Sequence, residues 1–192
     1  MIVIFFGPPG AGKGTQASLL SKHLEIPHLS TGDILRNQSL QKDKLGLELK
    51  NTLDKGELVT DKILNEIVQN RIGFRDCDSG FILDGYPRTM EQALFLDSIL
   101  NKKNLKINKI IDILADEETI ISRIKLRADI ENREDDKEEI IKTRISKYLS
   151  KTKPLSDYYK VQYSKGYYEV DGNKEIEEIN KDIIKISQNL GI

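Results

Sequence analysis

The sequence predicts a single α/β domain over residues 1–192, built on a five-stranded parallel sheet with helices on both faces. Three observations support this fold class. Short, apolar runs alternate with longer segments of helical periodicity, which is the pattern of a parallel sheet covered on both sides. A glycine-rich loop directly follows the first apolar run. The chain is also long enough to bury one large core.

The first strand and the loop after it predict a phosphate-binding site. Ile2 to Phe6 is apolar throughout, as expected for a strand buried on both faces. Residues 7–15 read Gly-Pro-Pro-Gly-Ala-Gly-Lys-Gly-Thr and lead into a segment patterned as a helix. Glycines let backbone N–H groups converge on one anion, the helix directs its positive end there, and Lys13 adds a full charge. The common G-x-x-x-x-G-K-[ST] pattern is met except that Gly14 follows the lysine, so the hydroxyl arrives at Thr15.

Helices and strands alternate along the rest of the chain. Ala17, Leu20 and Leu24 recur at helical spacing in the first helix, which Pro27 ends. Residues 37–58 carry only scattered leucines, so two small surface helices outside the core are expected there. The other strands are expected at 28–29, 81–84, 110–114 and 167–170, with helices ending near Ile72 and Lys102 and a last helix whose inward stripe is Ile176, Ile179, Ile183, Ile186 and Leu190.

Composition excludes several classes of protein. Thirty basic and 31 acidic residues leave the chain near neutrality, so a basic nucleic-acid surface is not expected. The apolar runs are shorter than a membrane span, and the N-terminus lacks the features of a signal peptide. Cys77 is the only cysteine, which excludes a disulfide framework and a cysteine-based zinc site. A cytoplasmic chain without membrane or nucleic-acid partners is therefore expected.

Two charged residues stand out from their positions alone. Asp84 ends a buried strand, and the carboxyl ends of parallel strands form the ligand-binding edge of such sheets. There it could order the water shell of Mg²⁺ bound to a nucleotide, although a capping or turn aspartate is the alternative. Arg144 falls in an apolar helical stripe with Ile141, Ile145 and Tyr148, where a cation needs an anionic partner. A snorkelling arginine or an internal ion pair is the alternative.

Five segments together resemble the adenylate kinase family of nucleoside monophosphate kinases. The resemblance covers the whole chain, and Gly12-Lys13-Gly14-Thr15 is the form of the loop that the family carries. It implies a P-loop nucleoside triphosphate hydrolase fold and Mg²⁺-dependent, reversible transfer of the terminal phosphoryl group of ATP to AMP, giving two ADP. The segments are Gly7–Thr15, Ser30–Asp33 with Arg36, Gly56–Asp61, Asp84–Arg88 with Gln92, and Asp171-Gly172.

On the donor side, the resemblance implies that ATP lies on the loop and under one helix. Arg123 and Arg127 are four residues apart and therefore share a helix face. In the family, matching arginines close over ATP, and the turn with Asn173 and Lys174 lies beside its adenine. The implied ATP-binding set is Gly10, Ala11, Gly12, Lys13, Gly14, Thr15, Arg123, Arg127 and Lys174.

On the acceptor side, the resemblance implies that Arg36 and Arg88 hold the phosphate of AMP, with Thr31 and Gln92 beside its adenine. Gln92 also completes a capping box with Thr89, and both roles are compatible. The implied AMP-binding set is Thr31, Arg36, Glu57, Leu58, Val59, Gly85, Tyr86, Pro87, Arg88, Gln92, Arg133 and Arg144.

For catalysis, the resemblance implies alignment and charge cancellation without a general base. Magnesium would be held through nucleotide phosphates, Thr15 and water on Asp84. Residues 30–59 form the acceptor insertion and residues 126–136 a lid, and both exclude water. Five residues separate Arg127 from Arg133 and span at most about 17 Å, which predicts a short loop without zinc. The implied catalytic set is Lys13, Asp84, Arg88, Arg123, Arg133 and Arg144.

Two other functions are compatible with parts of this pattern. A UMP/CMP kinase would share every phosphate-handling residue. A P-loop switch or nucleotide-dependent binding module would need no acceptor-side arginines, so Arg36 and Arg88 argue against it. By analogy with the family, the chain is expected to be a monomer whose small-molecule partners are ATP, AMP and ADP.

Overall fold

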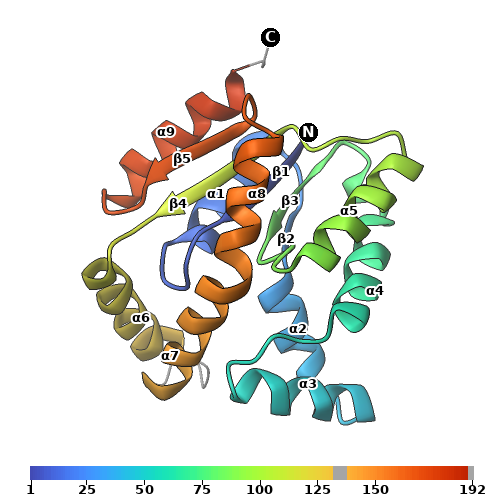
Figure 1. The fold of residues 1–192 in the computed structure, drawn as a ribbon, viewed down its shortest axis with the longest axis vertical. Coiled ribbons are helices and arrows are strands. Elements are labelled where there is room, and N and C mark those ends of the chain that lie inside the picture. The colour runs from blue at the N-terminus through green and yellow to red at the C-terminus, as the bar shows by residue number, and fades with distance from the viewer. Residues whose placement is uncertain (132–137, 190–192) are drawn as a thin grey trace.

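The computed structural model describes residues 1–131 and 138–189 and confirms the predicted α/β fold. Five parallel strands form one sheet in the order β2-β3-β1-β4-β5 (Figure 1). The central position of β1 places the residues that follow it at the middle of the carboxyl edge. The strands are β1 (Ile2–Phe6), β2 (His28–Ser30), β3 (Phe81–Asp84), β4 (Lys109–Leu114) and β5 (Tyr167–Asp171).

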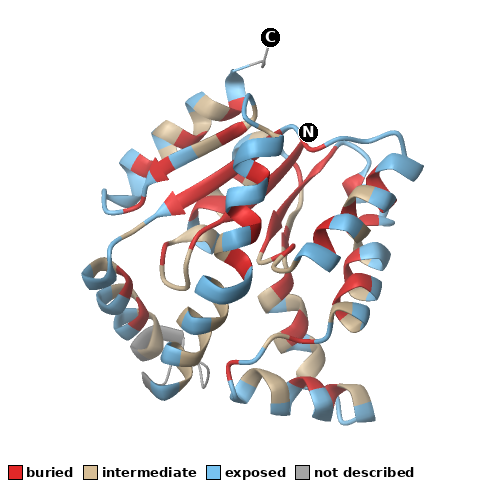
Figure 2. Cartoon of the chain, in the orientation of Figure 1, coloured by how far each residue is buried: buried red, intermediate tan, exposed pale blue. Residues whose placement is uncertain are grey.

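Alternate residues of β1 pack into two separate cores, because successive side chains of a strand point to opposite faces. Val3 and Phe5 pack with α1 (Lys13–Leu24) and α9 (Ile176–Gln188). On the other face, Ile2, Ile4 and Phe6 belong to the larger cluster, and Figure 2 shows the buried strands between exposed outer helix surfaces. The helices over that face are α4 (Asp61–Ile72), α5 (Met90–Lys102) and α8 (Lys153–Gln162).

Two capped helices follow β2 and form the insertion beside the sheet. Ser30 accepts a hydrogen bond from the Asp33 N–H at 3.3 Å and so caps α2 (Thr31–Ser39). Asp43 likewise accepts from the Gly46 N–H at 2.7 Å at the start of α3 (Lys44–Asp54). Both helices are amphipathic, and this corrects one expectation: Leu49 joins the main core, although residues 37–58 were expected to lie outside it. Leu35, which precedes that segment, joins the same core. The exposed Leu40 and Leu47 agree with the prediction.

Helix α6 (Glu117–Glu131) is longer than the sequence analysis implied. The loop was expected directly after Arg127, but the residues from Ala128 to Glu131 continue the helix. No glycine or proline interrupts this stretch, so nothing in it ends the helix. The rest of the predicted lid, including Arg133, lies outside the described residues.

A second long helical segment begins at Glu138 and returns to the sheet. Helix α7 (Glu138–Lys147) joins α8 through a π-helical turn at Tyr148–Thr152 (Figure 1). Near the C-terminus, Ile179 and Ile183 are buried as predicted, whereas Ile176 is 46% exposed because it begins α9 beyond the edge of β5. Leu190 lies outside the described residues. Among the described residues, no helix is both long and apolar enough to cross a membrane.

Candidate active site

The loop after β1 has the backbone that an anion-binding nest requires. Gly10 and Gly12 have φ angles of +86° and +91°, values that side-chain-bearing residues rarely adopt. A Cβ atom at Gly10 would lie 2.9 Å from the Ile120 carbonyl oxygen, so glycine also allows α6 to pack directly on the loop. Gly12 is the N-cap of α1, which places the positive end of that helix at the loop.

Lys13 folds back across this loop. Its Nζ donates hydrogen bonds to the carbonyl oxygens of Gly7 at 2.8 Å and Pro8 at 2.9 Å. Burial lowers the pKa of Lys13 to about 8; the charge of Asp84 opposes that shift, and the charge of Arg88 adds to it. With a pKa of about 8, the ammonium group of Lys13 is mostly protonated at pH 7 and loses its proton just above that pH.

Asp84 faces the same loop from the neighbouring strand. It pairs in register with Phe5, and a Cβ atom at Gly14 would lie 3.5 Å from its Oδ2. Burial alone would raise the pKa of this carboxyl, but the hydrogen bond from His28 Nε2 at 3.2 Å and the charge of Lys13 outweigh it. The pKa therefore lies below its usual range, and the group is an anion.

The donor set around Asp84 fits magnesium. Mg²⁺ prefers oxygen ligands, keeps several waters, and commonly uses one or two carboxylates together with substrate phosphates. Asp84 supplies the carboxylate and the exposed Thr15 a hydroxyl at the start of α1. Among the described residues, no group of three or more His, Cys, Asp or Glu side chains could hold a metal by itself. The absence of zinc stays a prediction.

Arg123 joins the loop to the turn after β5. Its guanidinium donates to the Ala11 carbonyl oxygen at 3.4 Å and to the Lys174 carbonyl oxygen at 3.1 Å. The turn is fixed to the connection between β4 and α6, because Asn173 Oδ1 accepts from the Asp116 N–H at 3.0 Å. The ammonium of Lys174 pairs with Asp182 of α9 at 2.9 Å, so its backbone, rather than its charge, lies nearest Arg123.

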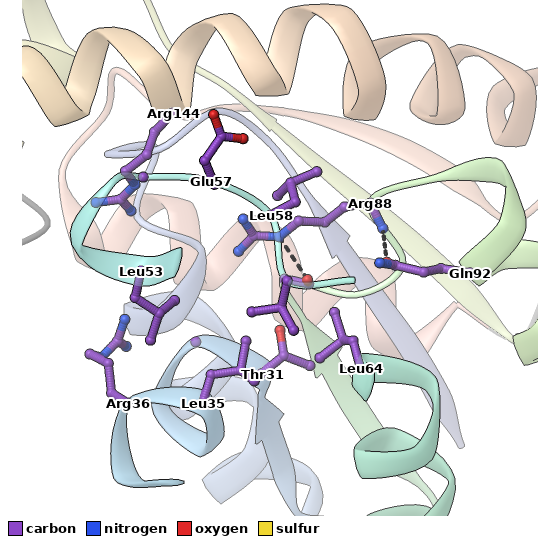
Figure 3. A pocket seen from close by; sticks show the side chains of 14 residues that line it. Thr31, Leu35, Arg36, Leu53, Glu57, Leu58, Leu64, Arg88, Gln92 and Arg144 are labelled. Atoms are coloured by element: carbon purple, nitrogen blue, oxygen red, sulfur yellow. Dashed lines mark hydrogen bonds between the residues drawn. The ribbon is translucent and has the colours of Figure 1, made fainter. Parts of the chain in front are cut away.

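A pocket opens between β3 and the helices α2 and α3, and we call it the acceptor pocket (Figure 3). Thr31 is buried at its floor and donates its hydroxyl to the Asp84 carbonyl oxygen at 3.1 Å. Figure 3 shows Arg36, Arg88 and Arg144 reaching this pocket from three different segments. The lining residues are Thr31, Gly32, Leu35, Arg36, Leu53, Gly56, Glu57, Leu58, Val59, Leu64, Gly85, Arg88, Gln92 and Arg144.

Gly85 allows Thr31 and Arg88 to stand side by side. It has a φ angle of +79°, and an added Cβ atom would lie 2.7 Å from Thr31 Oγ1 and 2.9 Å from Arg88 Nη2. Arg88 Nε donates to the Gly85 carbonyl oxygen at 2.8 Å, which bends the side chain back over the turn. Any side chain at position 85 would push the arginine away from the pocket.

Gln92 is fully buried, and both ends of its amide have protein partners. The Thr89 hydroxyl accepts from the Gln92 N–H at 3.2 Å, as predicted for the capping box. The reciprocal bond differs from the prediction, because the amide oxygen accepts from the Arg88 N–H at 2.7 Å rather than from Thr89. The amide nitrogen donates to Asp61 Oδ1 at 2.6 Å.

The acceptor pocket adjoins a second one at the phosphate loop, which we call the loop pocket. The loop pocket is lined by Gly7, Pro9 and Lys13, and also by the π-helical turn. Both pockets share Arg88 and Arg144 on their walls. Thr152 of the π-helical turn donates its hydroxyl to the Arg88 carbonyl oxygen at 3.3 Å, which ties that turn to the same wall.

The remaining predicted residues fall in different surroundings. Pro87 lines the loop pocket, whereas Tyr86 is buried in the core, where its hydroxyl donates to Asn65 Oδ1 at 2.7 Å. Arg36 forms an ion pair with Asp33. The charge of Arg127 is one of those that, after burial, lower the pKa of Lys13, which places that charge near the phosphate loop.

Sequence reasoning missed several neighbours of the site. The sequence analysis assigned no role to His28, which contacts the Asp84 carboxylate. Leu53, expected outside the core, lines the acceptor pocket together with Leu35 and Leu64. Their helical spacing could have shown that α2 and α3 turn an apolar face inward. Asp61, which binds the amide of Gln92, was noted only as the end of the segment Gly56–Asp61 and was given no role of its own.

Comparisons with known proteins agree with this geometry. A family model described as adenylate kinase matches residues 5–164. An adenylate kinase of Rhizobium meliloti is 44% identical over 192 residues, covering 97% of this chain and 99% of that protein. One from Fusobacterium nucleatum is 42% identical over 206 residues, covering 96% and 97%, and one from Archaeoglobus fulgidus is 40% identical over 218 residues, covering 99% of each. The chain therefore belongs to the adenylate kinase family, the enzymes that transfer a phosphoryl group from ATP to AMP.

Proposed function

We propose that phosphoryl transfer takes place at the wall between the two pockets, with ATP on the loop and AMP in the acceptor pocket. The observation that carries this proposal is that Arg88 and Arg144 line both pockets. A group moving from one nucleotide to the other would pass these guanidinium groups. Arg123 and Arg127 would hold the donor, and Arg36 the acceptor phosphate, with Thr31 and Gln92 beside the acceptor base.

The residues would act by position and charge. Lys13 and the loop N–H groups hold the donor phosphates, while Arg88 and Arg144 cancel charge that spreads over the transferring group. Such an arrangement needs no general base, since the acceptor phosphate is already an anion. Bound magnesium would supply charge neutralisation between the donor phosphates, and Asp84 would orient its water shell. Leu58 and the π-helical turn would limit access of water, which competes as an acceptor.

Several finer features belong to the same proposal. Residues 30–59 are the acceptor insertion, residues 126–136 are a short lid that contains Arg133, and the lid binds no zinc. Metal analysis that found stoichiometric zinc in the purified protein would contradict the last point. The protein is proposed to use Mg²⁺ and to work as a cytoplasmic monomer. The single cysteine, Cys77, is buried and supports a chain that does not depend on disulfides.

Replacement of Arg144 tests the proposed transfer site. Arg144→Ala should lower turnover on the order of 10²–10³-fold, because a preorganised donor to the developing charge is lost. The matched control is Arg75→Ala, since Arg75 is exposed in a short 3₁₀ turn on the opposite edge of the sheet. Turnover is measured from MgADP alone, as formation of ATP and AMP.

The thermal unfolding of the two variants separates catalysis from stability. Arg144→Ala should unfold within a few degrees of the unchanged protein. Near-normal turnover with a large drop in the unfolding temperature would show a structural ion pair, and the transfer site would then have to lie elsewhere.

A further inference from the structure

The amide of Gln92 is held by hydrogen bonds at both ends, from two different elements. Its oxygen accepts from the Arg88 backbone N–H at 2.7 Å. Its nitrogen donates at 2.6 Å to Asp61 Oδ1, on the first residue of α4. The same Asp61 oxygen accepts the Thr89 hydroxyl at 3.0 Å. The Asp61 carboxylate therefore holds both the side chain of Gln92 and Thr89, the N-cap residue of α5.

These partners allow only one orientation of the amide. A backbone N–H can only donate, so it must face the amide oxygen. A carboxylate can only accept, so it must face the amide nitrogen. Turning the amide by 180° would set two donors together at Arg88 and two acceptors together at Asp61. Each conflict would set like groups of the protein against one another, which costs free energy.

An amide in a fixed orientation presents its remaining hydrogen-bond acceptor and donor in a fixed order. The oxygen keeps one lone pair and the nitrogen one hydrogen for a ligand in the acceptor pocket. Adenine offers a complementary edge, since its 6-amino group donates and its N1 accepts. Hypoxanthine, the base of inosine monophosphate, offers the reverse, since its O6 accepts and its N1–H donates. Hypoxanthine would need the amide to turn.

We propose that Asp61 is a specificity-positioning residue: its carboxylate locks the amide of Gln92 in the order that reads adenine and rejects 6-oxopurines. Asp61 itself does not touch the base. The proposal rests on the proposed placement of the acceptor base beside Gln92. Without Asp61, the Arg88 N–H would be the one remaining restraint of these two, at the oxygen end of the amide.

Two variants of Asp61 test the lock. Asp61→Leu removes the acceptor at similar size, whereas Asp61→Asn keeps an oxygen that can accept from both Gln92 and Thr89. The measurement is kcat/KM for AMP and for inosine monophosphate at fixed MgATP. Asp61→Leu should lower the ratio of kcat/KM for AMP to kcat/KM for inosine monophosphate about tenfold. The change should come from a higher KM for AMP and a lower KM for inosine monophosphate. Asp61→Asn should keep the ratio within about twofold of the unchanged protein.

Separate effects on KM and on kcat distinguish a positioning role of Asp61 from a general loss of active-site structure. In Asp61→Leu, kcat with saturating AMP should stay within about threefold, because the phosphate-handling arginines are untouched. An unchanged AMP-to-inosine-monophosphate ratio in Asp61→Leu would overturn the proposal. So would an equal loss in Asp61→Asn, since the effect would then be one of charge.

A third variant tests the underlying acceptor site separately. Gln92→Leu should lower the selectivity for AMP over inosine, uridine and cytidine monophosphates, which the unchanged protein should favour by at least about two orders of magnitude. If Gln92→Leu leaves this selectivity intact, or if UMP or CMP outpaces AMP in the unchanged protein, the placement of the base is wrong. If Gln92→Leu lowers it but Asp61→Leu does not, only the lock is wrong.

Discussion

The charge of Lys13 depends strongly on its surroundings. Its ammonium donates to two carbonyl groups of the loop, yet burial lowers its pKa from 10.5 to about 8. A lysine with this pKa is largely protonated at pH 7 and largely neutral at pH 9. Phosphate binding at the loop should therefore respond to pH in the alkaline range.

We expect the affinity for ATP to fall as the pH rises through about 8. If only the protonated lysine binds, ATP should bind about tenfold more weakly at pH 9 than at pH 7. Titration calorimetry without acceptor, in buffers of different ionisation enthalpy, should also show proton uptake on binding near pH 8.5. Lys13→Met should bind weakly with no such pH dependence. Equal proton uptake in this variant would assign the titration to another group.

The same pKa shift has a defined sign for stability. Between about pH 8 and 10.5 the unfolded chain binds more protons at residue 13 than the folded chain does. The contribution of Lys13 to the free energy of unfolding therefore rises with pH in this window and is constant below it. Stability and ATP affinity should thus move in opposite directions as the solution becomes alkaline.

At the scale of elements, α3 shows how an insertion can contribute to the core. Leu49 is 1% exposed and packs in the main hydrophobic cluster, whereas Leu47 on the same helix is 63% exposed. Two leucines only two residues apart therefore differ fully in burial. They form a matched pair for measuring how strongly the insertion is anchored.

Leu49→Ala should lower the free energy of unfolding by about 2–5 kcal/mol, because it leaves a cavity in a packed core. Leu47→Ala should change it by less than about 0.5 kcal/mol. Denaturant unfolding followed by circular dichroism measures both. A small effect of Leu49→Ala would mean that the insertion unfolds separately from the sheet and α4.

At the scale of the whole molecule, the segment after α3 contacts α7. Glu57 pairs with Lys147 of α7 at 2.8 Å. Beside it, a Cβ atom at Gly56 would lie 2.8 Å from Ile140 and 3.2 Å from Arg144, so the two segments are in close contact. The position of the insertion is thereby connected to the position of Arg144.

Charge reversal tests this connection. Glu57→Lys places two cations together and should raise the KM for AMP about two- to fivefold at low salt, the scale of a half-exposed ion pair. The double variant Glu57→Lys with Lys147→Glu should restore the KM, and added salt should shrink the difference. If the double variant fails to restore it, Glu57 acts on AMP directly.

The sequence predicted the parts of the molecule that depend on local pattern. The five strands, the glycine-rich loop between β1 and α1, and the placement of Asp84 at the sheet edge all follow from apolar runs and glycine spacing, and all are confirmed. The burial of Leu49 and the contact of His28 with Asp84 depend on how distant segments pack. No local pattern carries that information. The length of α6 was underestimated because the loop was inferred from arginine positions rather than from helix-ending residues.

The π-helical turn between α7 and α8 keeps three side chains of this helical segment on the same face, toward the loop pocket. In a regular α-helix, residues four apart drift by about 40° around the axis, so three such residues gradually leave one face. The wider turn at Tyr148–Thr152 offsets this drift, and Arg144, Tyr148 and Thr152 all line the loop pocket. One residue more or fewer between Arg144 and Thr152 would rotate the arginine by about 100°. The direction of Arg144 is thus encoded in the length of this segment more than in its composition.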